Sequence, residues 1–510
     1  MKHLPLLCVL LMAQSLFAQH EWVLQPWMQV AGSYNGQQLG KSVSYLGKKN
    51  DSTLIGVGDG SGTIYVYQVK SPADTIPKYT IKGNSCLLGD FNGDGIKDLA
   101  VSGNPTKIYL GKSAGVFDTI PFFVKYQEKN GSAFGAYIAI GKITDHIFDD
   151  ILITDVGYPN GDTQCKVYLF KGGVSMHTIP FSTFTGDTIF SGFGLGIASG
   201  DLNNDGFDDI IVRGYDQTNS SNGQRFCYIK IYCGGDTIHS TYWKYLKGTN
   251  VVFGGLSCFD VNGYGIDDLL WSNTDSLNSV VYVNYGKPVI DSMPNLRLKD
   301  PGTGGLDVIE NGGDVNGDGY NDIVIGAPGY GQELGTVLIF SGGPKIDANY
   351  DAAASLSVQS QFGRSIASIG DVDGDGCADI LVGAPRYQWD EYRGKWFIML
   401  GSKRIPVSSV VGQRPTTPSN FNLSQNYPNP FNPTTTIGYE LSITSYIALK
   451  IFDVLGREVA VLVNKEQEAG KHTVAFDAGQ LSGGIYFYRL TAVNKQGKVQ
   501  TEAKRMTLLK

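Results

Sequence analysis

The sequence predicts an all-β protein: a seven-bladed β-propeller followed by a small C-terminal immunoglobulin-like β-sandwich. Three observations support this prediction. Glycine (66 residues), tyrosine (28) and phenylalanine (24) are abundant, whereas long stretches with a helical spacing of apolar residues are absent. An acidic motif recurs along most of the chain at intervals of 52 to 59 residues. After residue 420 this repeat stops, and a different, alternating pattern begins.

The first 18 residues have the features of a secretory signal peptide. Lys2 precedes an apolar run over residues 4–12, and Ala18 is a small residue suited to cleavage, so the mature chain is expected to start near Gln19. Cys8 lies in the middle of the apolar run, which disfavours a lipid-anchored cysteine. No later stretch is long enough to cross a bilayer as a helix. We therefore expect an exported protein without a transmembrane segment.

The negative charge is concentrated in one part of the chain. The formal net charge is −7, but residues 1–18 carry +1, residues 403–420 carry +3 and residues 421–510 carry +3, which leaves −14 for residues 19–402. Nucleic-acid binding needs basic surfaces that replace the counterions of the phosphates. This acidic body argues against a nucleic-acid partner and favours a cation.

The acidic repeats define six units, and a seventh precedes them. Four segments match Asp-x-Asn/Asp-x-Asp-Gly-x-x-Asp followed by apolar residues: 90–98, 201–209, 314–322 and 371–379. A fifth, 260–268, has Tyr264 in place of the middle acid, and a sixth, 142–150, keeps the spacing but loses the early acids. The segment 39–47 resembles the lead-in of the other units without an acidic loop. Internal repeats of this length are typical of propellers.

Each unit also shows the same order of strands. A short strand precedes the acidic loop, and an apolar strand, a glycine-rich turn and two further strands follow it. Four-stranded units arranged around an axis form the blades of a propeller, which protects the sheet edges. The seventh unit ends near residue 400 without its outer strand. We predict that residues 21–30 supply this strand and close the ring.

The spacing of oxygen-bearing residues in the loops predicts calcium sites. Calcium takes six to eight oxygen ligands at about 2.3–2.6 Å. Side chains at loop positions 1, 3, 5 and 9 and the carbonyl at position 7 can surround such an ion, while glycine at position 6 permits the sharp turn. Four sites are expected, with ligands from Asp90, Asn92, Asp94, Ile96 and Asp98; Asp201, Asn203, Asp205, Phe207 and Asp209; Asp314, Asn316, Asp318, Tyr320 and Asp322; and Asp371, Asp373, Asp375, Cys377 and Asp379. A fifth, weaker site would use Asp260, Asn262 and Asp268.

Two alternatives to these calcium sites fit the sequence less well. An EF-hand requires a glutamate at position 12 on a helix, whereas position 12 here is apolar and strand-forming. Metal-free turns are disfavoured because clustered carboxylates repel one another without a cation. In the third unit, the Lys142 ammonium is expected to take the place of the ion beside Asp150. The sites are expected to stabilise the fold rather than to catalyse a reaction.

The last two units resemble a known family. Their loops are followed by Ile323-Val-Ile-Gly-Ala-Pro328 and Ile380-Leu-Val-Gly-Ala-Pro385, and Phe362-Gly363 lies ahead of the second. These segments resemble the FG-GAP repeats of integrin α-chain propellers. The resemblance extends from residue 39 to about residue 402, although the motif is degenerate in the first, third and fifth units. It implies that residues 19–402 form one propeller domain.

Residues 403–420 contain three prolines and no periodicity, as in a linker. Residues 421–510 then show alternating strands of a small sandwich. The motifs Tyr427-Pro-Asn-Pro-Phe431, Asp453-Val-Leu-Gly-Arg-Glu458 and Ser482-Gly-Gly-Ile-Tyr-Phe-Tyr-Arg489, with the basic tail from Lys504 to Lys510, resemble the sorting domain of the bacterial type IX secretion system. The resemblance implies contact with that machinery and a location outside the cell or on the surface of a Gram-negative bacterium. A fibronectin-like adhesive module is the alternative.

No catalytic site is evident in the sequence. Gly111-Lys-Ser-Ala-Gly115 fits the nucleophile-elbow pattern but lies where other units have an inter-strand turn. His146, His177 and His239 lack the spacing of metal ligands. We therefore expect a non-enzymatic binding or adhesion protein with an extracellular protein or glycan ligand. An extracellular hydrolase or lyase acting on polysaccharide or phosphodiester is the alternative, and a structural surface-layer component is a third.

Overall fold

The structure, a computed structural model, describes residues 26–509 except for 114, 128–131, 158–163, 188–191, 217–225, 249–253, 276–277, 300–304, 330–332, 357, 388–391, 406–421, 424, 427, 442–444, 455–456, 468–469 and 495–498. The chain divides into two compact units, Met1–Ser409 and Val410–Lys510. The prediction of an all-β fold is confirmed, because the described elements are β-strands. The predicted signal peptide and most of the predicted linker lie outside the described residues.

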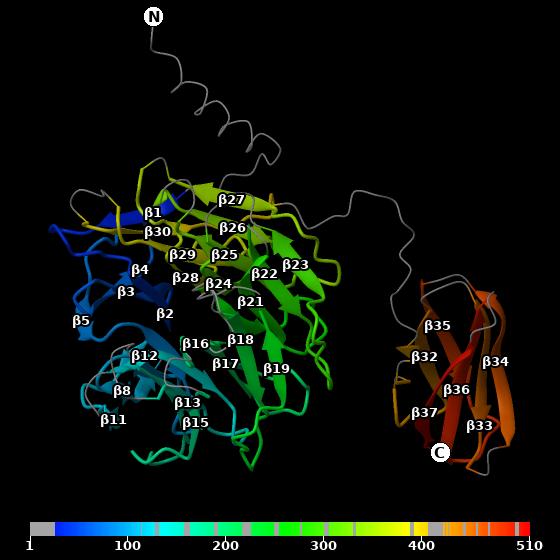
Figure 1. The fold of residues 1–510 in the computed structure, drawn as a ribbon. Helices are drawn as coiled ribbons and strands as arrows, with labels where there is room; N and C mark the ends of the chain where they lie inside the picture. The colour runs from blue at the N-terminus through cyan, green and yellow to red at the C-terminus, as the bar shows by residue number, and fades with distance from the viewer. Residues whose placement is uncertain are drawn as a thin grey trace, which may run out of the picture. The chain divides into compact units, whose positions relative to one another are not determined.

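The first unit contains seven four-stranded antiparallel sheets within its described residues (Figure 1). In the order of strands across each sheet they are β2 (Ser42–Lys49), β3 (Ser52–Gly58), β4 (Thr63–Val69) and β5 (Tyr79–Lys82); β6 (Cys86–Gly89), β7 (Asp98–Val101), β8 (Thr106–Tyr109) and β11 (Phe123–Lys125); β12 (Ser132–Gly141), β13 (Asp150–Gly157), β14 (Lys166–Phe170) and β15 (Ser182–Thr185); β16 (Gly196–Gly200), β17 (Asp209–Asp216), β18 (Phe226–Tyr232) and β19 (Lys244–Lys247); β20 (Leu256–Phe259), β21 (Asp268–Asp275), β22 (Asn278–Asn284) and β23 (Leu296–Lys299); β24 (Val308–Gly313), β25 (Asp322–Ala327), β26 (Thr336–Phe340) and β27 (Ala352–Ser355); and β28 (Ser365–Gly370), β29 (Asp379–Ala384), β30 (Lys395–Met399) and β1 (Pro26–Ala31).

The sheets are arranged around a common axis. The first-named strand of each sheet contacts the first-named strand of the next, and β28 contacts β2, so these strands are the innermost ones of a ring. The last sheet is completed by the N-terminal strand β1, which pairs antiparallel with β30 so that Met28 faces Ile398 and Val30 faces Trp396. The predicted closure is confirmed for residues 26–31, and residues 21–25 lie outside the described part. The propeller prediction therefore holds.

Apolar side chains fill the spaces between neighbouring sheets. Alternating residues of each strand point to opposite faces, and both faces of most blade strands are buried, as in β25, whose six residues are all buried. Each of the seven clusters of buried side chains in this unit draws on two adjacent sheets. The cluster that joins the last sheet to the first contains Met28, Val57 and Trp396. The ring is thus held together by packing on both sides of every sheet.

An additional hairpin follows the third strand of the second sheet. It consists of β9 (Gly111–Ser113) and β10 (Val116–Phe117), which pair antiparallel. The Gly111–Gly115 motif therefore lies in a hairpin, and the strand-to-helix elbow that a nucleophile would need is not formed by its described residues. The interpretation of this motif as an inter-strand turn agrees with the structure.

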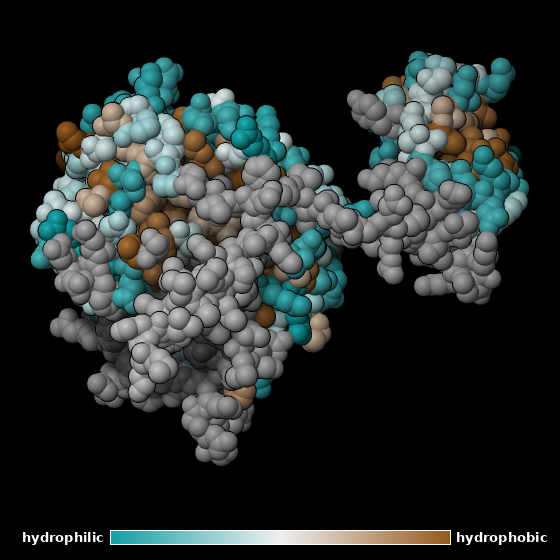
Figure 2. Space-filling model, turned by 90° about the horizontal axis from the view of Figure 1, so that it is seen from above, coloured by the Kyte–Doolittle hydropathy of each residue, from teal (hydrophilic) through white to brown (hydrophobic). Residues whose placement is uncertain are grey.

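The second unit is a sandwich of two antiparallel sheets around one core. The strands, in sheet order, are β31 (Asn422–Leu423), β32 (Thr434–Leu441) and β35 (Gly470–Asp477), and β34 (Glu458–Gln467), β33 (Ser445–Phe452), β36 (Gly484–Asn494) and β37 (Val499–Leu508). The expected basic tail is instead part of β37, because Met506 and Leu508 alternate with exposed residues and point into the core. The surface view shows apolar side chains gathered on one part of this unit (Figure 2). No helix in the described residues has the length and hydropathy of a membrane span.

Candidate metal centres

Each acidic loop joins the innermost strand of a sheet to the second strand. The loop 371–379, for example, follows β28 and leads into β29. The glycine at position 6 has a positive φ in all five acidic loops, between +76° and +94°, which agrees with the predicted sharp turn. Loop position 4 also has a positive φ. In the fourth loop, which has no glycine at this position, Asn204 adopts a φ of +62°. Hydrogen bonds join consecutive loops, such as those from the Asp149 N–H to the Asp90 carbonyl and from the Ala378 N–H to the Asp314 carbonyl, so these loops lie at one end of the ring.

The aspartate at position 1 shapes the turn. In the seventh sheet, the backbone N–H groups of Gly374 and Gly376 donate to Asp371 Oδ1 and Oδ2 at 2.6 and 3.0 Å. The aspartates at position 1 of the other four acidic loops accept equivalent hydrogen bonds from their own loops. These bonds hold one carboxylate over the concave side of each turn.

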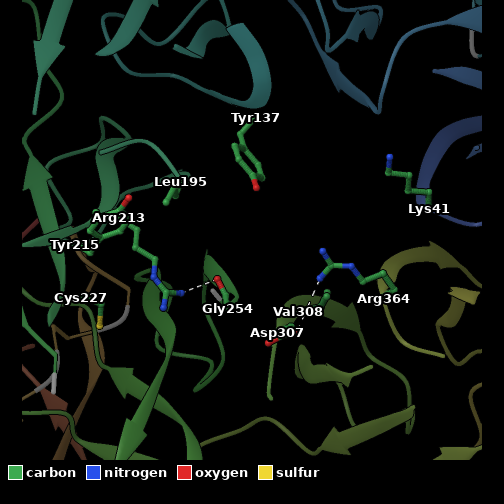
Figure 3. Close-up of a pocket in the computed structure, with 11 residues that line it drawn as sticks. Lys41, Tyr137, Leu195, Arg213, Tyr215, Cys227, Gly254, Asp307, Val308 and Arg364 are labelled. Atoms are coloured by element: carbon green, nitrogen blue, oxygen red, sulfur yellow. Dashed lines mark hydrogen bonds and ion pairs between the residues drawn. The ribbon is translucent and has the colours of Figure 1, made fainter. Parts of the chain in front are cut away.

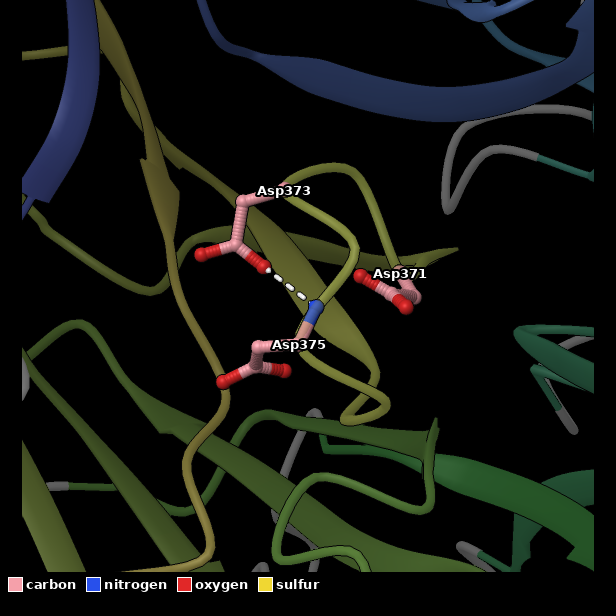
Figure 4. A group of neighbouring side chains, drawn as sticks. All are labelled: Asp371, Asp373 and Asp375. Atoms are coloured by element: carbon pink, nitrogen blue, oxygen red, sulfur yellow. Dashed lines mark hydrogen bonds between the residues drawn. The ribbon is translucent and has the colours of Figure 1, made fainter.

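The seventh loop brings three carboxylates together (Figure 4). Oxygen atoms of Asp371, Asp373 and Asp375 all lie within 4.8 Å of one another. Two oxygens on opposite sides of a calcium ion at its usual ligand distance are about 5 Å apart, so this spacing fits a single ion. The backbone N–H of Cys377 donates to Asp375 Oδ1 at 2.8 Å, which fixes that side chain against the turn.

The second, fourth and sixth loops have an asparagine at position 3, whose amide contacts the position 5 aspartate in the second and sixth loops and Asp209 in the fourth. The amide nitrogen of Asn92 donates to Asp94 at 2.8 Å, and that of Asn316 donates to Asp318 at 3.1 Å. The amide oxygen of Asn203 is buried and has no hydrogen-bond donor among the described residues. A buried polar oxygen without a partner is costly, and a cation in the loop would satisfy it.

The aspartate at position 9 has a role that the sequence analysis missed. In all six loops this residue is fully buried. In the seventh sheet, Asp379 accepts the backbone N–H of Val372 at 2.7 Å, and Val372 is at loop position 2. Asp379 also accepts, at 2.8 Å, the backbone N–H of Gly401, which follows β30. The same pair of bonds is made in four other loops. In the third sheet, Asp150 accepts the backbone N–H of Thr144, at loop position 3, and that of Gly172. This carboxylate therefore clamps the loop to the turn after the third strand.

Burial raises the pKa of these carboxyl groups. The pKa rises to about 7 for Asp209, Asp268, Asp322 and Asp379, and to about 6 for Asp150. Desolvation is the main cause in each case, and the two backbone N–H donors oppose it. A divalent cation beside the carboxylate would favour the ionised form and lower the pKa.

The third and fifth loops differ from the others. Lys142 Nζ donates to the carbonyl oxygen of Ile147 at 3.1 Å and pairs with Asp149 at 3.4 Å. The ammonium was expected beside Asp150, but it pairs with the preceding residue, while Asp150 accepts two backbone N–H groups. The ammonium nevertheless occupies the loop.

In the fifth loop, the amide nitrogen of Asn262 donates to both oxygens of Asp268, at 3.0 and 2.9 Å. Tyr264, where the middle acid is missing, is 68% exposed. This loop therefore offers fewer free oxygens than the four complete ones.

His146 and two of the tryptophans pack against other side chains. The ring of His146 lies against Phe207, with 4.2 Å between the centroids. Trp271 and Trp396 are buried in the clusters between sheets. Trp389 lies outside the described residues.

Comparison with known families and proteins agrees with this architecture. The FG-GAP repeat family matches residues 311–340 and 362–394, and the family described as "Secretion system C-terminal sorting domain" matches residues 425–502. Integrin alpha-5 of Xenopus laevis is 28% identical over 245 residues, which cover 44% of this chain and 22% of the integrin. Integrin alpha-4 of Xenopus laevis is 25% identical over 325 residues, covering 61% and 26%.

A phosphatidylinositol-glycan-specific phospholipase D of Bos taurus is 34% identical over 111 residues, which cover 19% of this chain and 13% of that protein. The chain thus spans about a quarter or less of the length of these curated relatives. The C-terminal match indicates type IX secretion to the extracellular space or the cell surface. The chain therefore combines FG-GAP repeats similar to those of integrin α-chains with a C-terminal sorting domain of the type IX secretion system.

Proposed function

We propose that this protein is a secreted, calcium-binding β-propeller that acts as an extracellular binding or adhesion module. The observation that carries the calcium assignment is the group of carboxylate oxygens from Asp371, Asp373 and Asp375 within 4.8 Å. The unsatisfied amide oxygen of Asn203 supports a second ion in the fourth sheet. The loops of the second and sixth sheets have the same design. Four ions are proposed, and the fifth loop is the weakest candidate.

The charge of the propeller supports the same conclusion. Four calcium ions would bring eight positive charges to a segment whose formal charge is −14, and would reduce its self-repulsion. Extracellular calcium modules have dissociation constants of about 10⁻⁴–10⁻³ M, so each site would add about 0.4–1.4 kcal/mol of stability at about 1 mM calcium. The ions are proposed to support the fold and not to take part in a reaction.

Elemental analysis of the purified full-length protein tests this proposal. About four calcium ions per chain are expected, in line with four complete ligand sets. Asp375→Asn should lower the number by one, because Asp375 supplies one of the three clustered carboxylates and all four complete loops have an aspartate at its position. Asp236→Asn, at an exposed residue outside the loops, is the matched control and should leave the number unchanged. A protein that retains no calcium would refute the assignment.

The binding role is proposed from the architecture and the relatives together. A propeller holds its inter-strand loops on a rigid ring, and such loops commonly carry recognition surfaces. The proposed ligand is an extracellular protein or glycan. A glycan array and a pull-down from cell surfaces, both with the secreted protein, would identify its class.

The alternative, an extracellular hydrolase or lyase acting on polysaccharide or phosphodiester, has one observation in its favour. One relative carries the name of a phospholipase D, although the match covers only 13% of that protein. Assays on polysaccharide and phosphodiester substrates separate the two proposals. Turnover that is lost on a single Asp→Asn change outside the calcium loops would favour the enzyme.

A further inference from the structure

A cavity of about 320 Å³ lies at the centre of the ring (Figure 3). Its walls come from six of the seven sheets, and several lining residues lie at or just before the start of an innermost strand, such as Lys41 before β2 and Arg364 before β28. The acidic loops follow the opposite ends of these strands. The cavity therefore opens at the end of the ring away from the candidate calcium sites.

The cavity is positively charged although the propeller is acidic. Lys41, Arg213 and Arg364 line it, and Asp307 is the carboxylate among the described lining residues. Arg364 Nη1 lies 3.9 Å from Asp307 Oδ2, which is a loose pair that leaves most of the guanidinium free to bind another group. No hydrogen bond or ion pair of the Lys41 ammonium is found among the described residues.

Arg213 is held rigidly in the wall. Its side chain is buried, and Nη1 donates to the carbonyl oxygen of Gly254 at 2.6 Å while Nη2 donates to that of Ser272 at 3.1 Å. A guanidinium stays charged in such surroundings. It adds a fixed positive potential to a partly enclosed space, where charges are screened less than at an open surface.

We propose that this cavity binds a small organic ligand through an oxyanion group, a carboxylate or a phosphate, held between Lys41 and Arg364. Figure 3 shows the side chains of Lys41, Tyr137 and Arg364 pointing into the same space. The planar guanidinium of Arg364 matches the two oxygens of such a group, the Lys41 ammonium adds a second charge, and the Tyr137 hydroxyl can donate a third hydrogen bond.

The size of the cavity limits the ligand. Ligand sites usually measure about 300–1,000 Å³, so this cavity is at the small end and suits a group of about the size of one sugar. A neutral sugar would leave the cationic groups without a counter-charge. The site would therefore select an acidic sugar or a similarly small organic anion, and it does not depend on the calcium sites.

Isothermal titration calorimetry on the full-length protein tests this proposal with three related probes: glucuronate, glucose 6-phosphate and glucose. At least one of the two anions should bind, more weakly as salt is raised, and glucose should not. The stronger of the two anions identifies the oxyanion. Arg364→Gln and Lys41→Gln should each weaken binding by about tenfold or more, because each removes a charged hydrogen bond.

Arg386→Gln is the matched control, since Arg386 follows the second strand of the same sheet and pairs with Glu333 at 3.0 Å away from the cavity wall. It should leave binding unchanged. If Arg364→Gln lowers the melting temperature, the binding measured with Lys41→Gln tests the proposal, because the Lys41 ammonium has no hydrogen bond or ion pair among the described residues. Failure of both anions to bind at about 10 mM, well above the range of weak specific ligands, would overturn the proposal. So would equal binding of glucose, or anion binding that survives both substitutions. Repeating the titration in EGTA keeps this result separate from the calcium proposal.

Discussion

The buried aspartate at loop position 9 can be tested apart from any metal in the third sheet, by replacing Asp150 with asparagine. Asp150 Oδ2 accepts the backbone N–H of Thr144 at 2.7 Å, and Oδ1 accepts that of Gly172 at 2.8 Å. Asparagine retains one acceptor oxygen and places an NH₂ group where the other oxygen was. One of the two backbone N–H groups would then face a donor inside the protein.

The expected cost follows from these two bonds. Loss of a hydrogen bond to a charged group and burial of an unsatisfied N–H each cost about 1–3 kcal/mol. Asparagine also removes a carboxylate whose burial is unfavourable, as its raised pKa of about 6 indicates. We therefore expect Asp150→Asn to lower the free energy of unfolding by about 1–3 kcal/mol.

Urea unfolding in EGTA measures this change without a contribution from calcium. Asp236→Asn, at an exposed position, serves as the control and should alter the free energy of unfolding by less than about 0.5 kcal/mol. Asp379→Asn should cost as much as Asp150→Asn in EGTA, and about 0.4–1.4 kcal/mol more at about 1 mM calcium. An Asp150→Asn variant as stable as the control would refute the clamp.

Three further predictions concern the ring as a whole. Met28→Ala should lower the free energy of unfolding in urea by about 2–5 kcal/mol, because Met28 is 2% exposed between the last and first sheets. Gln29→Ala, on the exposed face of the same strand, should have little effect, and equal effects would argue against ring closure by β1. Excess EGTA should lower the melting temperature and added calcium should restore it, while an unchanged melting curve would count against the calcium sites. Burial raises the pKa of Glu310 on β24 from 4.5 to about 7, so the folded protein holds a proton there that the unfolded chain has lost, and stability should fall as the pH rises from about 4.5 through 7. Glu310→Gln should reduce this fall between pH 5 and pH 8 in thermal unfolding, and an identical pH dependence in the variant would contradict the assignment.

The repeat pattern was sufficient to predict the blades. Each acidic motif has an invariant place between two strands of one sheet, so even the degenerate segment 142–150 marks the start of a second strand. Ring closure could also be predicted, because the last unit is one strand short and residues 21–30 precede the first unit as the outer strands precede the others; the structure shows this pairing from Pro26 onward. These features depend on local patterns and on a fixed order of strands.

Other features could not be predicted, because they depend on contacts between distant residues. Spacing alone cannot distinguish a metal ligand from a hydrogen-bond acceptor, so the clamp by Asp379 to Gly401 was missed. The central cavity was missed because Lys41, Arg213 and Arg364 come from different units and share no motif. In strand β37, the basic residues obscure the alternation that buries Met506.

The position of β30 has a consequence for processing. This strand, the last that the chain adds to the propeller, lies between β29 and β1 and has hydrogen-bonded neighbours on both sides. Ile405 is 4% exposed and packs against the last two sheets. A protease that cleaves beyond Ile405 would therefore release the sorting domain without exposing an unpaired strand of the propeller. The propeller would then keep its stability after export.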